Sequence, residues 1–162
     1  MELSFGMIFS IILIIIFMGF AFWAVMKFIE PKNAIEIGLF MDDLQGEVDK
    51  AWQSVGDYQE PKTFSLPKQI EYVCFMDCES GERGGFRNYY RDLSLGCGGD
   101  TNLIFYPYGS GETLDSQIEH IALSEITKSK NPNCFENVNE KVSIIIKKDR
   151  DLSPLTILED GN

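Results

Sequence analysis

The chain has 162 residues and a formal net charge of −11, from 14 basic and 25 acidic side chains. Its length allows one small domain with a core of its own, even after a single apolar helix is set aside. The acidic balance disfavours nucleic acid as a partner, because binding to phosphates needs a basic surface that releases counterions.

The first element is apolar. Residues 3–26 carry no charged side chain and read LSFGMIFSIILIIIFMGFAFWAVM. As a helix this stretch would be about 36 Å long, more than the roughly 30 Å of a bilayer's hydrocarbon core. A secretory signal has a basic first segment and a small-residue exit, whereas Met1 and Glu2 come first here. We therefore predict a retained helix at residues 1–29 that spans a membrane or packs in an apolar assembly. A cleaved signal is the alternative.

A second, amphipathic helix is predicted for residues 30–56, joined to the first at Pro31, where a kink is expected. Its apolar residues recur at alternating three- and four-residue steps, as in a heptad-like seam: Ala34, Ile37, Met41, Leu44, Val48, Ala51 and Val55, broadened by Phe40 and Trp52. The seam covers the domain's own sheet or packs against neighbouring copies, and a stripe this wide allows both. Gly56 and Pro61 are expected to end the helix.

From residue 57 to residue 162 the pattern is typical of strands. We predict strands at residues 63–66, 69–76, 102–106, 141–148 and 155–158. Residues 77–100 are expected to form a long loop or short helix, residues 117–126 a strand or a helix, and residues 129–134 a loop. The predicted fold class is α+β: a long hydrophobic and amphipathic helix, then a small antiparallel sheet domain stapled by disulfides.

The cysteines suggest a compartment. All four lie in the polar part, without the paired spacing of structural zinc sites: Cys74, Cys78, Cys97 and Cys134. In a membrane-anchored chain this pattern favours two disulfides outside the cytoplasm, with three pairings open. Reduced core cysteines in a cytosolic domain are the alternative, and Lys27 and Lys32 after the helix also favour a cytoplasmic domain. We give the cysteines more weight and predict an extracytoplasmic domain.

No residue pattern indicates an active site. The single histidine, His120, lies in an apolar segment, and packing or surface is its expected role. Neither Asp42 with Asp43 nor Asp149 with Asp151 supplies the oxygen ligands of a calcium loop. No cofactor, metal or enzymatic activity is therefore predicted.

An apolar helix that continues into an amphipathic one, followed by a cysteine-bearing β domain, resembles the type IV pilin plan. The resemblance implies a non-enzymatic subunit of a surface filament, whose apolar helices pack together and whose partners are copies of itself and, before assembly, membrane lipid. The residues that would carry self-assembly are Ile11, Ile12, Ile15, Phe17 and Phe20 in the apolar part, and Ile37, Met41, Leu44 and Val48 in the stem.

Two shorter segments resemble uncharacterised single-pass proteins of small-genome archaea: IEYVCF at residues 70–75 and NPNCFENVNEKVSIIIKKD at residues 131–149. This second resemblance implies a pairing of Cys74 with Cys134 and of Cys78 with Cys97. It implies no activity.

Two other functions compete with the filament subunit. One is a monomeric, membrane-anchored binding module, for which an exposed aromatic patch around Tyr89, Tyr90, Tyr106 and Tyr108 would be a marker. The other is a membrane-bound enzyme, which no group of residues supports.

Overall fold

The computed structural model describes residues 5–110, 117–148 and 156–160. The chain forms two compact units, Met1–Ile35 and Glu36–Asn162. Helix α1 covers Phe5–Gln53, so Pro31 does not end it. From Glu36 on, the residues predicted as a separate stem (30–56) therefore belong to the C-terminal unit.

The predicted α+β class is confirmed, and the antiparallel strands form two three-stranded sheets. After α1 the elements are β1 (Tyr58–Ser65), β2 (Tyr72–Phe75), α2 (Arg87–Leu93), a 3₁₀ helix η1 (Ser94–Gly96), β3 (Leu103–Tyr106), α3 (Leu123–Ile126), β4 (Asn133–Glu136), β5 (Lys141–Lys148) and β6 (Thr156–Asp160).

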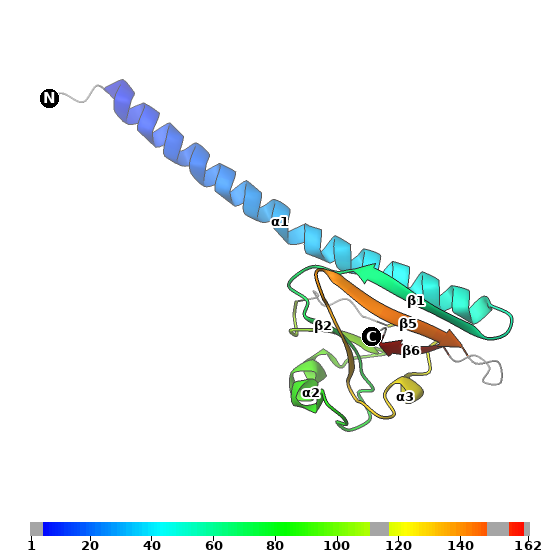
Figure 1. The fold of residues 1–162 in the computed structure, drawn as a ribbon. Coiled ribbons are helices and arrows are strands. Elements are labelled where there is room, and N and C mark those ends of the chain that lie inside the picture. Colours follow the sequence, from blue (N-terminus) through cyan, green and yellow to red (C-terminus); the bar gives the residue numbers. More distant parts are fainter. Residues whose placement is uncertain (1–4, 111–116, 149–155, 161–162) are drawn as a thin grey trace. The chain divides into compact units, whose positions relative to one another are not determined.

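The first sheet has the strand order β1-β5-β6, with β5 in the middle (Figure 1). In β5, Val142, Ile144 and Ile146 are fully buried, while the residues between them face the other side of the sheet. This alternation follows from the two-residue period of a strand. Pro61 lies in β1 opposite Ile145, and an edge strand tolerates it because the missing N–H faces away from the ladder.

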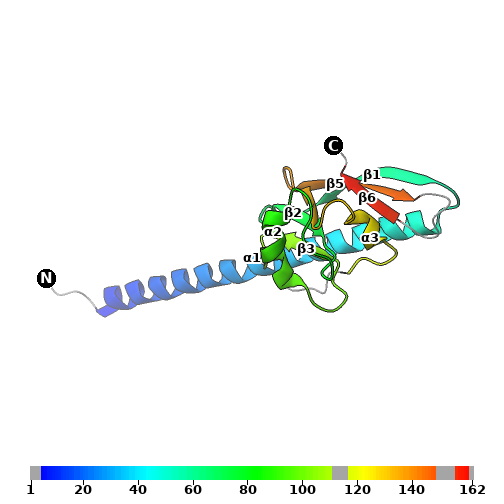
Figure 2. The ribbon, with the colours of Figure 1, turned by 90° about the horizontal axis from the view of Figure 1, so that it is seen from below.

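The second sheet has the order β3-β2-β4 and is covered on both faces. Val73 and Phe75 of β2 belong to the first core, which also contains residues of α1 and of both sheets. Cys74 and Tyr72 point to the opposite face and belong to a second, smaller core. Helix α2 packs against this second core, to which its Leu93 belongs, and both views draw it next to this sheet (Figures 1 and 2).

The part of α1 in the C-terminal unit is held by its apolar side. Phe40 and Leu44 are almost completely buried. The Phe40 ring meets Phe64 of β1 and Phe105 of β3 edge-on, with centroids 5.6 and 5.8 Å apart. Each such side chain contributes about 2 kcal/mol through burial.

The C-terminal end of α1 is capped by a lysine from β5. The Nζ atom of Lys148 donates hydrogen bonds to the carbonyl oxygens of Trp52 at 2.6 Å and Ser54 at 2.8 Å. A cation is stabilising there because the last carbonyls of a helix are unpaired and carry partial negative charge. Val55 lies beyond the helix and is fully exposed, so its predicted place in the seam is wrong. Gly56, with φ +93°, follows as the chain turns toward β1.

Several predicted boundaries are also wrong. Strand β1 begins at Tyr58 instead of residue 63, the strand predicted for residues 69–76 is limited to Tyr72–Phe75, and the last strand is Thr156–Asp160 instead of residues 155–158. Strand β4 lies partly in the stretch predicted as a loop. The sequence does not indicate it because four residues are too few to show a periodic pattern.

The ambiguous segment at residues 117–126 is neither a full strand nor a full helix. The Asn102 side chain pairs with both backbone groups of Ile118, which satisfies that backbone without a ladder. Only Leu123–Ile126 is helical.

Candidate functional site

The most distinctive surface is the apolar part of α1. Gly6–Met26 is long and apolar enough to cross a membrane, and no part of it is buried. Phe17 is 68% exposed and Ile15 63%, and the other predicted assembly residues of this part, Ile11, Ile12 and Phe20, are exposed as well. The surface is therefore continuous around the helix instead of forming one stripe.

The one hydroxyl of this window has a partner within the helix. The Ser10 hydroxyl donates to the carbonyl oxygen of Gly6 at 2.9 Å. The Phe20 and Trp23 rings are in contact, with centroids 5.9 Å apart. This part of the helix thus presents hydrocarbon and aromatic rings with few free polar atoms, which suits an apolar environment.

The predicted assembly role of the stem residues is wrong for three of the four. Ile37, Leu44 and Val48 are 0% exposed in the core of their own unit, and Met41 packs partly against the same core. Ile37, Leu44 and Val48 therefore have no exposed surface that a neighbouring copy could contact. The sequence allowed both uses of the seam, and the structure favours the one in which it covers its own sheet.

The second core contains all four cysteines. Cys74 in β2 pairs with Cys134 in β4, and Cys78 pairs with Cys97. This is the pairing that the archaeal resemblance implied. The first disulfide is almost completely buried, whereas Cys78 and Cys97 are partly exposed.

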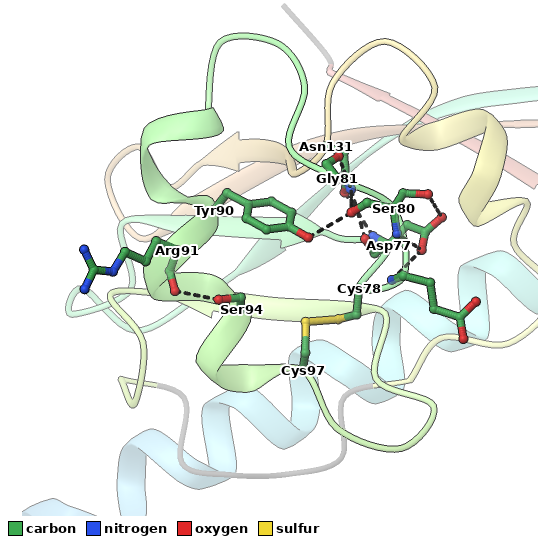
Figure 3. The surroundings of a disulfide bond; sticks show 10 residues. Asp77, Cys78, Ser80, Gly81, Tyr90, Arg91, Ser94, Cys97 and Asn131 are labelled. Atoms are coloured by element: carbon green, nitrogen blue, oxygen red, sulfur yellow. Dashed lines mark hydrogen bonds between the residues drawn. A yellow bond between two sulfur atoms is a disulfide. The ribbon is translucent and has the colours of Figure 1, made fainter.

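Asn131 organises the loop that follows β2. It is completely buried, and its Nδ2 atom donates to the carbonyl oxygens of Asp77, Ser80 and Gly81, while its Oδ1 atom accepts from the Asp77 amide (Figure 3). The Ser80 hydroxyl and the amides of Glu79 and Ser80 in turn donate to the Asp77 carboxylate. These bonds, the Ser80 hydroxyl first, hold the pKa of Asp77 below its ordinary value.

The tyrosines named as a possible binding patch are mostly packed. Tyr89 lies edge-on to Tyr106, with centroids 4.7 Å apart, and both belong to the second core. The Tyr90 hydroxyl donates to the Ser80 carbonyl at 2.8 Å. Of the four, only Tyr108 is exposed, at 41%. The contiguous aromatic patch expected of a binding module is absent from these residues.

His120 has a packing and hydrogen-bonding role, as expected from the sequence. Its ring stacks on Trp52 at 4.3 Å, and its Nδ1 atom lies 3.0 Å from a carboxylate oxygen of Asp49. The His120 contact, followed by the Gln45 side chain, lowers the pKa of Asp49. Neither partner is a nucleophile that a histidine base would activate.

The next feature is the placement of side chains that could bind a metal ion. Within residues 5–110, 117–148 and 156–160, no three His, Cys, Asp or Glu side chains gather as a metal site would require. Asp42 and Asp43 are exposed on α1, while Asp149 and Asp151 lie outside the described residues.

Two residues with important structural roles could not be recognised from the sequence. Asn131 precedes Pro132, which signals a turn but not a buried hub. Lys148 ends a strand and gave no sign that it caps a helix that ends some ninety residues earlier (94 positions separate it from Ser54). Comparison with protein-family models, with curated proteins and with solved structures finds no match for this chain.

Proposed function

We propose that the chain is a structural subunit of a cell-surface filament, on the plan of type IV pilins, and that its apolar helix anchors it in a membrane before assembly. The observation that carries the proposal is that no residue of Gly6–Met26 is buried. A helix apolar on all sides is stable in lipid or among other apolar helices, and not in water.

The exposed residues point in all directions around the helix, which favours contact with several neighbouring molecules over contact with a single partner helix. Successive residues of a helix point about 100° apart, so Ile11 and Ile12 face different directions. One partner helix would cover a single stripe and leave the rest in water. Lipid covers all sides, and so does a bundle of copies in a filament.

The length of this window suits the membrane stage. Its 21 residues make a helix of about 31 Å, close to the roughly 30 Å of a bilayer's hydrocarbon core. The two disulfides favour an oxidising compartment for residues 36–162. We therefore place this unit on the outer side of the membrane, exposed to solvent.

A monomeric membrane-anchored module is the second candidate. It is favoured by the burial of Ile37, Leu44 and Val48 in their own core, since this leaves assembly to the apolar window alone. Such a module would use that window for lipid only.

The first experiment breaks the apolar window. In the full chain, Ile12→Asp with Ile15→Asp should remove the protein from the membrane fraction and abolish filaments seen by electron microscopy. Each charge near the middle of a membrane helix costs about 3 kcal/mol. The matched control, Leu95→Asp with Val138→Asp, places the same charges on exposed residues of the C-terminal unit and should change neither property. Unchanged membrane binding and filaments in the Ile12/Ile15 variant would refute both candidates.

The second experiment separates the two candidates. Phe17→Ala keeps the helix apolar, so membrane binding should persist, but it should reduce filament yield because a ring is lost from the predicted packing set. Leu95→Ala is the control, since Leu95 is 66% exposed and lies in the C-terminal unit, outside the apolar window. Material that stays monomeric after detergent is exchanged for lipid, in the unmodified chain, would instead support the anchored module.

A further inference from the structure

Residues 84–101 form an excursion whose two ends are fixed. At the first end, Arg83 and Asn131 exchange backbone hydrogen bonds of 2.8 and 2.9 Å. At the other end, the Asn102 side chain forms hydrogen bonds with the backbone of Ile118. The backbone carbonyl oxygen of Asn102 accepts a hydrogen bond from the Met76 amide at 3.0 Å. The chain between these points carries α2 and η1.

Glycine pairs lie just inside both ends, at residues 84–85 and 98–99. Gly84 and Gly99 have φ angles of +79° and +52°, in the region that favours glycine. Backbone rotation is least restricted at such residues. Both ends of the excursion therefore have the residues of a hinge.

The excursion covers the aromatic face of the second sheet. Leu93 of α2 is completely buried, and the Phe86 ring lies 5.4 Å from the ring of Tyr72. Tyr89 packs on Tyr106 from the same side. Helix α2 has only seven residues, which is too short to persist in water without this packing.

Few bonds hold the excursion to the fixed loop beside it. One is the Cys78–Cys97 disulfide, and another is the hydrogen bond from Tyr90 to the Ser80 carbonyl, both drawn in Figure 3. The disulfide joins the loop fixed by Asn131 to the last turn of the excursion. It is also the more accessible of the two disulfides, because Cys74 is 0% and Cys134 only 7% exposed.

We propose that residues 84–101 are a redox-locked flap over the second sheet. A dithiol reductant supplies two electrons and two protons to the Cys78–Cys97 bond, which becomes two thiols, while the reductant becomes a disulfide. The flap then swings on its glycine pairs and uncovers Tyr72, Ile104 and Tyr106, while the first core stays folded because it contains no cysteine. This property goes beyond the proposed filament function and does not depend on it.

Hydrogen–deuterium exchange on the full chain in detergent tests the lock. Cys78→Ser with Cys97→Ser should raise the exchange of amides in residues 87–97 by about tenfold or more, and leave those of residues 142–146 within about twofold. Brief treatment of the unmodified chain with dithiothreitol should give the same pattern. The control, Cys74→Ser with Cys134→Ser, keeps the lock and should raise exchange first in β2 and β4.

Two results would overturn the proposal. If exchange in residues 87–97 stays unchanged in the Cys78/Cys97 variant, packing alone holds the flap. If exchange rises equally in β5, the disulfide supports the whole unit and there is no independent flap.

Discussion

The two faces of the β3-β2-β4 sheet are held in different ways. The face toward α1 belongs to a large core without cysteine, in which Phe40, Leu44 and Phe75 are among the buried side chains. The opposite face belongs to a small core that contains all four cysteines. A small core buries too little apolar surface to order a loop-rich segment by itself, and covalent bonds reduce the entropy cost of ordering it. The comparison shows that one sheet can be stabilised by burial on one side and by crosslinks on the other.

The largest effect on this comparison should come from the buried crosslink. Replacing Cys74 and Cys134 with Ala should lower the free energy of unfolding by about 4 kcal/mol, since the disulfide closes a loop of 60 residues. Thermal unfolding of the full chain in detergent measures it. A loss under about 1 kcal/mol would show that the sheet's hydrogen bonds suffice without the crosslink.

A substitution in the cysteine-free core should come next. Leu44→Ala should cost about 3 kcal/mol, because the side chain is completely buried and leaves a cavity. Leu39→Ala is the matched control on the same helix, since Leu39 is 57% exposed and should change stability by less than about 0.5 kcal/mol. Equal effects of the two substitutions would mean that α1 does not pack as described.

The fixed loop beside the second core should respond to Asn131→Ala with a loss of about 2 kcal/mol. The substitution leaves the Asp77 amide without its acceptor and the Ser80 and Gly81 carbonyls without the Asn131 donor. Asn88→Ala, at an exposed position of α2, is the control. Chemical denaturation gives both values, and the prediction fails if they agree.

The smallest effect concerns pH. Asp77, Asp49 and Glu47 have lowered pKa values in the folded chain, caused first by the Ser80 hydroxyl, by His120 and by Lys50, respectively. Their stabilisation is present above the unfolded values near pH 4 and is lost as the pH falls through the folded ones. Melting temperatures from pH 7 to pH 3 should therefore fall at the acid end. Asp77→Asn, which cannot be ionised, should flatten that fall, and an identical profile would exclude Asp77 as a contributor.

Local patterns predicted a large part of this molecule. The apolar run ending at Met26, the alternation in β5 and the loop or short helix of residues 77–100 are all visible in the sequence, because each reflects a periodicity or a composition of neighbouring residues. The candidate anchor surface could be found for the same reason. Strand β4 could not, since its role depends on pairing with β2 across sixty residues, as in Cys74 and Cys134.

By itself the sequence determined that one helix is apolar on all sides and that an α+β domain with four cysteines follows it. Only the tertiary structure decided that Ile37, Leu44 and Val48 face their own sheet and that the strands divide into two sheets. It also showed that every cysteine lies on one side of β2. The physical reason is that a periodic pattern states which side chains must be buried, whereas the surface that buries them comes from residues far away in the chain.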